Sequence, residues 1–209
     1  LFPVLMMGTS SKRINSTGAI AGMLVGLLAT CLYIFTYLGW FFIPGTNMLP
    51  NTADNWLFGN AGANVLSGLD GDDYLSGGTG ADTLIGGLGD DRYVVDDAGD
   101  TVSENPGEGI DSVESSVTWA LGADFENLSL TGYANIDGTG NGLHNEICGN
   151  PAANHLDGGA GNDILDSAGG WDVMTGGPGD DFFLLRSGGE QVVEQPGEGT
   201  DTVRSLVYG

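Results

Sequence analysis

Aspartate side chains recur at a fixed spacing in this chain, each two residues after a glycine. Three consecutive nonapeptides, residues 68–76, 77–85 and 86–94, carry glycine at the fourth position, aspartate at the sixth and a large apolar residue at the eighth. Carboxylate and backbone carbonyl oxygens are the ligands that calcium prefers, and calcium takes roughly 6 to 8 of them. One short loop cannot supply that many oxygens, so the spacing predicts calcium sites that are shared between stacked loops.

Six loops keep both the glycine and the aspartate, and we predict that they hold calcium. Their aspartates are Asp73, Asp82, Asp91, Asp163, Asp172 and Asp181, and their glycines are Gly71, Gly80, Gly89, Gly161, Gly170 and Gly179. In two further loops Asn64 and Asn154 replace the carboxylate by an amide, which offers an oxygen without a charge. Sites that use these amides are therefore expected to bind calcium more weakly. Residues 167–170 lack the double glycine with which the pattern begins, so the loop before Asp172 departs from it.

The elements that position these loops are predicted from the rest of each nonapeptide. Glycines at the first, second and fourth positions allow positive φ and tight turns. The three residues after each aspartate alternate outward, inward and outward, as in a short strand. Two nonapeptides then form one coil, so loops eighteen residues apart share a side, which pairs Asp73 with Asp91 and Asn64 with Asp82. The predicted inward ladder consists of Leu57, Leu66, Leu75, Leu84, Tyr93, Ile147, Leu156, Leu165, Met174 and Phe183.

A shift of ninety residues superposes the chain on itself. Residues 86–91 fall on 176–181, residues 106–109 fall on 196–199, and Asp111 falls on Asp201. Within the spacer that follows the first block we predict strands and coils without metal loops. Because the sequence stops opposite Trp119 of the first copy, we expect a fragment of a longer repeat protein.

The predicted division is an amino-terminal flank at 1–17, a membrane helix at 18–43, a linker at 44–58, a first calcium block at 59–97, a spacer at 98–139, a second calcium block at 140–186 and a truncated second spacer at 187–209.

The pattern G-G-x-G-x-D-x-U-x, in which U is a large apolar residue, is similar to the calcium-binding repeat of RTX, or hemolysin-type, proteins. This resemblance covers residues 59–209 and implies a parallel β-roll that binds several calcium ions. It also implies a segment that is unfolded at low calcium, is exported and folds outside the cell. The predicted fold class is all-β, a parallel β-solenoid of nonapeptide repeats preceded by one transmembrane helix.

Charge divides the chain into two chemically different parts. Residues 1–53 carry only Lys12 and Arg13, whereas all 28 acidic residues follow, against three arginines, for a net charge of −23 over the whole chain. An acidic surface repels nucleic acid and attracts multivalent cations, so calcium is a predicted partner and nucleic acid is not. Cys31 and Cys148 do not suggest a disulfide framework.

Residues 18–43 contain no charged side chain and exceed the ~20 residues that a helix needs to cross a bilayer. Lys12 and Arg13 favour an amino end in the cytoplasm, which places the repeats outside. A signal peptide is the alternative, although the apolar run is long and no clear cleavage site closes it. On Lys12-Arg13 and on residues 18–23 and 40–50, the segment 1–58 resembles a late transmembrane segment of sodium:solute symporters of the acetate-permease type. This resemblance implies no transport activity, because the sequence lacks the other helices of the transporter bundle.

Motifs for catalysis are missing from the sequence. It has no H-E-x-x-H, no G-x-S-x-G and no phosphate-binding loop. His144 and His155 are predicted to face solvent. The leading hypothesis is a non-catalytic calcium-binding module at the cell surface or outside the cell, adhesin-like or associated with secretion and anchored by residues 18–43. The alternatives are a folding and export appendix of a secreted protease or lipase, and a fragment of a membrane symporter fused to repeats.

Overall fold

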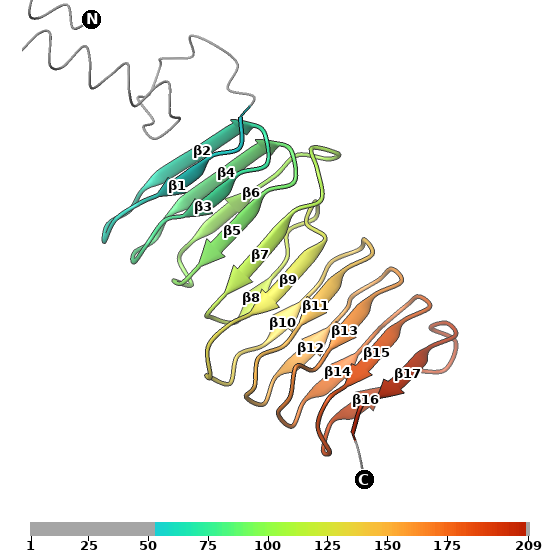
Figure 1. Cartoon of the computed structure of the whole chain (residues 1–209). Coiled ribbons are helices and arrows are strands. Elements are labelled where there is room, and N and C mark those ends of the chain that lie inside the picture. Colours follow the sequence, from blue (N-terminus) through green and yellow to red (C-terminus); the bar gives the residue numbers. More distant parts are fainter. Residues whose placement is uncertain (1–52, 208–209) are drawn as a thin grey trace, which may run out of the picture. The chain divides into compact units, whose positions relative to one another are not determined.

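Seventeen short strands wind residues 53–207, the part that the computed structural model describes, into a parallel β-solenoid (Figure 1). One face is a continuous parallel sheet of nine strands, in which each strand pairs with the strands one coil before and after it. These strands are β1 (Trp56–Phe58), β3 (Tyr74–Ser76), β5 (Arg92–Val95), β7 (Ser112–Ser115), β9 (Asn127–Leu130), β11 (Glu146–Cys148), β13 (Ile164–Asp166), β15 (Phe182–Leu185) and β17 (Thr202–Ser205).

The opposite face is divided into two sheets. The first has three strands, β2 (Val65–Asp70), β4 (Thr83–Leu88) and β6 (Thr101–Ser103). The second has five strands, β8 (Trp119–Ala120), β10 (Gly138–Thr139), β12 (His155–Asp157), β14 (Val173–Thr175) and β16 (Gln191–Val193). The described residues contain no helix, which agrees with the all-β prediction for this part of the chain.

The strand register confirms the predicted coil length in the calcium blocks. Leu57 pairs with Leu75, and Leu75 pairs with Tyr93, so one coil takes eighteen residues. The spacer departs from this length: Tyr93 pairs with Val113, twenty residues later, and Val113 pairs with Leu128, fifteen residues later. The divided face is interrupted at this point, between β6 and β8. The spacer contains strands, among them β7 and β9, as predicted.

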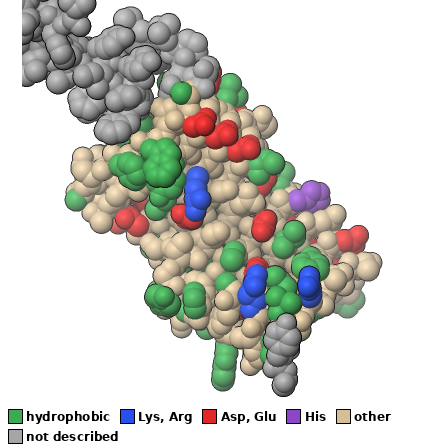
Figure 2. Space-filling view, in the orientation of Figure 1, with side chains coloured by type: hydrophobic (Ala, Val, Ile, Leu, Met, Phe, Trp, Pro, Cys, Tyr) green, Lys and Arg blue, Asp and Glu red, His purple; other side chains and the backbone are tan. Residues whose placement is uncertain are grey.

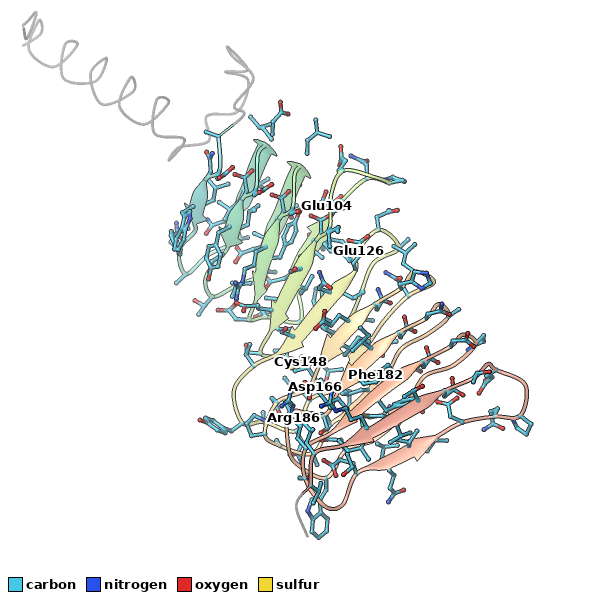
Figure 3. The ribbon with its side chains drawn as sticks, turned by 45° about the vertical axis from the view of Figure 1, so that its right-hand side comes forward. Glu104, Glu126, Cys148, Asp166, Phe182 and Arg186 are labelled. Atoms are coloured by element: carbon cyan, nitrogen blue, oxygen red, sulfur yellow. The ribbon has the colours of Figure 1, made fainter. Side chains whose placement is uncertain are left out.

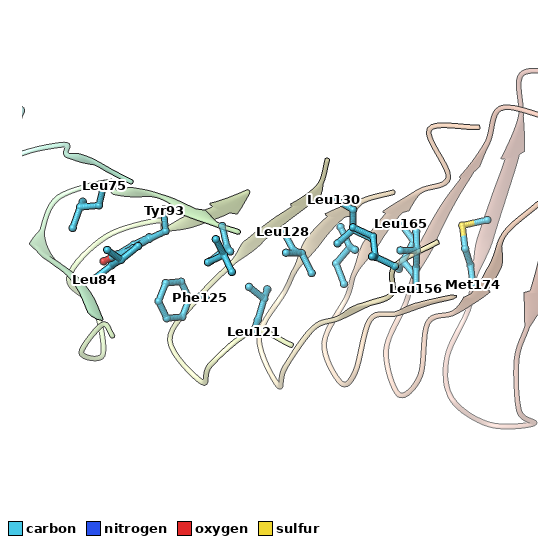
Figure 4. Close-up of a cluster of buried hydrophobic side chains, with 14 of the residues drawn as sticks. Leu75, Leu84, Tyr93, Leu121, Phe125, Leu128, Leu130, Leu156, Leu165 and Met174 are labelled. Atoms are coloured by element: carbon cyan, nitrogen blue, oxygen red, sulfur yellow. The ribbon is translucent and has the colours of Figure 1, made fainter. Parts of the chain in front are cut away.

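A ladder of apolar side chains fills the interior between the two faces (Figure 4). Nine of the ten predicted members are buried, and eight of these, among them Leu75, Leu84 and Phe183, are fully enclosed at 0% exposure within the described residues. Leu66 is partly buried, because β2 is the edge strand of its three-stranded sheet. The irregular spacer coils are filled by further buried residues: Val95, Val113, Leu121, Phe125, Leu128, Leu130 and Ile136.

The predicted membrane helix at 18–43, its flank at 1–17 and the linker up to residue 52 lie outside the described residues. Among residues 53–207, no helix is long and apolar enough to cross a membrane.

Substitution Leu84→Ala is expected to lower the free energy of unfolding in saturating calcium by about 2–5 kcal/mol, because it leaves a cavity at a fully buried rung of the ladder. Leu66→Ala removes the same atoms from a partly buried position and should cost clearly less. Urea unfolding of both variants measures the difference. Equal losses would contradict a core that is continuous through Leu84 and open at Leu66.

Candidate metal sites

The connecting loops lie along two edges of the solenoid. Edge 1 is formed by loops that leave the nine-stranded sheet, and it carries Asn64, Asp82, Asn154 and Asp172. Edge 2 is formed by loops that return to that sheet, and it carries Asp73, Asp91, Asp163 and Asp181. Figure 3 shows Glu104 and Glu126 on edge 2, with Asp166 and Arg186 on the opposite side. Each edge therefore stacks loops that are far apart in the sequence.

One oxygen of each predicted aspartate joins neighbouring coils. Each of the six side chains is at most 2% exposed, and its Oδ1 accepts a backbone N–H from the residue eighteen positions earlier. Asp73 N–H donates to Asp91 Oδ1 at 2.7 Å, and Asn64 N–H donates to Asp82 Oδ1 at 2.7 Å. Both predicted loop pairs are thus confirmed. This hydrogen-bond ladder fixes the carboxylates at the coil interfaces.

The second oxygen of the same aspartates has no partner. Oδ2 is buried and makes no hydrogen bond in Asp73, Asp82, Asp91, Asp163, Asp172 and Asp181. These are the six aspartates that the spacing selects. A buried carboxylate oxygen without a donor is costly, and a cation would remove that cost. The arrangement of these residues therefore fits calcium.

The first glycine of the nonapeptide leaves space beside this free oxygen. A Cβ added to Gly68 would lie 1.9 Å from Asp73 Oδ2 and 2.8 Å from the carbonyl oxygen of Gly86, in the next coil. A Cβ added to Gly158 would likewise lie 2.4 Å from Asp163 Oδ2 and 2.7 Å from Gly176 O. A carboxylate oxygen and a carbonyl oxygen from consecutive coils thus converge at a point that any larger residue would fill. Convergent hard oxygens of this kind suit calcium.

The expected positive φ is found at only two of the three glycine positions. All six predicted fourth-position glycines have positive φ, from +98° at Gly170 to +157° at Gly179. Second positions adopt it too, including the non-glycine residues Leu69 at +86° and Ala168 at +56°. The first-position glycines Gly68 and Gly77 are not among the positive-φ residues, so the prediction was wrong for this position. Glycine is needed there for space beside the carboxylate.

Burial opposes ionisation of the loop aspartates. It raises the pKa of Asp73, Asp163 and Asp172 to about 6 and that of Asp91 to about 7, and neighbouring carboxylates raise these values further while backbone donors lower them. The pKa of Asp181 is also raised by burial. Folding without a cation therefore places ionised carboxylates at neutral pH in surroundings that disfavour their charge.

The two predicted asparagine ligands are already hydrogen bonded. Asn64 Oδ1 accepts the N–H of Asn60 at 2.6 Å, and Asn154 Oδ1 accepts the N–H of Asn150 at 2.8 Å. Asn154 Nδ2 also donates to the Ile136 carbonyl of the preceding coil at 2.6 Å. An amide closes these loops through its own donors and acceptors. Their role as weak calcium ligands stays a prediction, and the geometry favours a hydrogen-bonding role.

A second ladder runs along the solvent side of edge 2. Here the side chain at the fifth position accepts the N–H of the next coil, as Asp72 does from Asp90 at 2.9 Å. The exposed His144 belongs to this ladder, because its Nδ1 accepts the N–H of Asn162 at 2.7 Å. The sixth-position aspartates accept from the coil before, so the two ladders point in opposite directions. His155 is also exposed, as predicted.

Two aspartates that the motif did not select occupy equivalent places. Asp100 Oδ1 accepts the Asp82 N–H at 2.9 Å, and Asp111 Oδ1 accepts the Asp91 N–H at 2.9 Å. Asp100 lacks the fourth-position glycine, and Asp111 is displaced by two extra residues. The eighteen-residue spacing from Asp82 would have identified Asp100, and the ninety-residue repeat pointed to Asp111.

The spacers also carry carboxylate clusters that the prediction of coils without metal loops did not include. Asp91, Glu104 and Asp111 each offer an oxygen within 4.8 Å of the others, and Asp181, Glu194 and Asp201 do the same in the second copy. Burial, followed by the charges of Asp111 and Asp91, raises the pKa of Glu104 to about 8. Burial raises the pKa of Asp111 to about 7.

Comparison with known proteins agrees with the loop geometry. The family model described as RTX calcium-binding nonapeptide repeat (4 copies) matches residues 51–84, 67–102 and 149–183. These segments contain all six predicted aspartates. No curated protein matches the chain. The resemblance of residues 1–58 to symporters stays an expectation.

Substitution Gly68→Ala is expected to raise the calcium concentration needed for folding, because the new methyl group would overlap Asp73 Oδ2 and the Gly86 carbonyl. Overpacking of this kind costs about 1–3 kcal/mol. Gly142→Ala is the matched control, since no atom lies within 4 Å of its added Cβ. The midpoint of a calcium titration followed by circular dichroism compares them, and equal midpoints would contradict the assignment of the Gly68 space to a metal.

In the absence of calcium, the free energy of unfolding is expected to increase as pH falls from 8 to 5. The loop carboxylates have folded-state pKa values of about 6 to 7, above their ordinary value, so the folded chain binds more protons than the unfolded chain in this window. This stabilisation is complete below the ordinary carboxyl pKa and is lost as pH rises through the folded-state values. Far-UV circular dichroism in chelator, followed from pH 8 to pH 5, measures the trend as a rise in the folded fraction. A stability that is constant or higher at pH 8 would contradict it.

Proposed function

We propose that this chain is a non-catalytic structural module whose solenoid folds as its loop aspartates take up calcium. The observation that carries the proposal is the set of six buried, unpartnered Oδ2 atoms on the six aspartates of the nonapeptide pattern. The matched segments of the repeat family support calcium as the ion.

The donor set favours calcium over other common metals. The convergent atoms at the nonapeptide loops are carboxylate and carbonyl oxygens, whereas zinc prefers nitrogen and sulfur ligands. Magnesium requires near-ideal octahedral geometry and gives up its water reluctantly. A space lined by a carboxylate oxygen and a backbone carbonyl oxygen from consecutive coils suits the larger and more adaptable calcium ion. His144 already uses Nδ1 to accept a hydrogen bond, and it lies at an exposed loop position.

Calcium would act by joining one coil to the next. The Oδ1 hydrogen bonds already link each aspartate to the preceding coil, and the free Oδ2 faces a carbonyl of the following coil at Gly86 and at Gly176. An ion held at this point would fix consecutive coils together and neutralise their charges. Because each coil stabilises only its neighbours, such binding is expected to be cooperative along the solenoid.

The surface supports an action outside the cell. Acidic side chains lie along the described solenoid (Figure 2). Its three arginines include Arg92 and Arg186, which pair with Glu114 and Asp166. Sites with few carboxylates per ion bind calcium at about 10⁻⁴–10⁻³ M, the range of extracellular modules. We therefore place the module at the cell surface or in the extracellular medium, where an adhesin-like or secretion-associated role suits an elongated solenoid. The apolar segment 18–43 is its proposed anchor.

The test is a calcium titration of the full chain from a chelated start, followed by far-UV circular dichroism. We expect a cooperative gain of β-structure with a midpoint of ~0.1–1 mM calcium, and no comparable transition with magnesium. A spectrum that is already β-rich in chelator at neutral pH and unaffected by calcium would overturn the proposal.

Substitution Asp163→Asn should raise this midpoint by about two- to tenfold, because it removes the charge of one ligand while preserving its size. Glu146→Gln is the matched control, as it removes one negative charge from an exposed position on β11. Equal shifts in the two variants would indicate that only net charge matters.

A further inference from the structure

Each copy of the repeat ends in a cluster of three carboxylates, two of which lie outside the nonapeptide pattern. The first cluster consists of Asp91, Glu104 and Asp111, and the second of Asp181, Glu194 and Asp201, at positions ninety residues apart. In each cluster, one oxygen of every member lies within 4.8 Å of the others. Glu104 stands on edge 2, where the first spacer begins (Figure 3).

The first cluster contains buried oxygens that lack donors. Asp91 and Asp111 are each 1% exposed, and Asp91 Oδ2 has no hydrogen-bond partner. Both carboxylate oxygens of Glu104 are buried without a well-formed hydrogen bond. In the second cluster the unpartnered oxygens are Asp181 Oδ2 and Glu194 Oε2. Ionised carboxylates that lack donors and lie this close together are costly, and a bound cation would remove that cost.

Glu104 changes the composition of a nonapeptide site. In the block, the free aspartate oxygen faces the backbone carbonyl of the next coil's first residue, as Asp73 Oδ2 faces Gly86 O. Glu104 is that first residue for Asp91, and it turns its side chain into the space. A Cβ added to Gly86 would lie 2.0 Å from Asp91 Oδ2, 2.2 Å from Tyr93 Oη and 2.5 Å from Glu104 Oε1. Three side-chain oxygens thus surround one point.

We infer that each cluster is a distinct calcium site that closes its block and fills before the nonapeptide sites. This inference deepens the proposed calcium-binding function and rests on it. Calcium affinity rises with the number of charged ligands. Each cluster offers three carboxylates to one ion, whereas a nonapeptide loop contributes one.

The two clusters differ at one position of the core. In the first copy, Tyr93 Oη accepts the Gly86 N–H at 2.6 Å, and only a weak contact from the Gly87 N–H reaches the Glu104 carboxylate. Phe183 replaces this tyrosine in the second copy, and Glu194 Oε1 accepts the equivalent Gly176 N–H at 3.0 Å. The first site therefore keeps one more carboxylate oxygen without a well-formed hydrogen bond, and it is expected to bind calcium more tightly than the second.

The experiment measures bound calcium per full chain by equilibrium dialysis over a range of free calcium. Glu104→Gln and Glu194→Gln should each weaken one of the tightest sites at least about tenfold, and the double variant should lose two ions at low free calcium. Glu146→Gln removes an exposed charge from β11 and should lose none. Tyr93→Phe should lower the affinity of the first site toward that of the second.

The outcomes separate this inference from the proposed function. Unchanged tight binding in both glutamine variants overturns the inference. The nonapeptide sites alone would then account for calcium-driven folding. Binding of two ions only, both lost in the double variant, supports the inference and overturns the nonapeptide sites. If the wild-type chain binds no calcium, both fail. Circular dichroism in saturating calcium verifies folding, and if one variant does not reach the wild-type spectrum, the other decides.

Discussion

The structure depends on the position of a buried carboxylate between two coils. One oxygen of each loop aspartate is hydrogen bonded to the coil before it, and the other is buried without a donor. The same side chain therefore both aligns the coils and makes their contact unfavourable when it is ionised. The apolar ladder supplies the interior, but each of its rungs contacts only its neighbours. The loop contacts add to the coupling between neighbouring coils.

Amides and carboxylates have different roles along the two edges. Asn145, which begins the second block on edge 2, donates Nδ2 to the Phe125 carbonyl at 3.0 Å while its Oδ1 accepts the Asn141 N–H at 2.7 Å. Asn154 acts in the same way on edge 1. Each amide carries its own donor, so it binds a carbonyl of the preceding coil directly. The carboxylates that follow have no such donor.

Much of this arrangement is predictable from the sequence because its determinants are local and periodic. The period of nine selects Asp73, Asp82 and Asp91 together with the inward ladder, and two periods per coil give the observed pairing. The sequence could not show why the first position of the nonapeptide is glycine. A positive φ and a lack of space for a side chain both favour glycine, so the residue type does not distinguish them. The clusters were missed for a different reason: Glu104 and Asp111 meet only after two inserted residues have changed the register.

The interruption between β6 and β8 has a mechanical consequence. The nine-stranded face runs through both blocks without a break, whereas the opposite face is two separate sheets. A load applied along the rod is carried across the spacer by one sheet only, with the packed side chains of Val113, Phe125 and Leu128 behind it. Bending stiffness is therefore lowest at the spacer, which acts as a flexural joint between two stiffer segments.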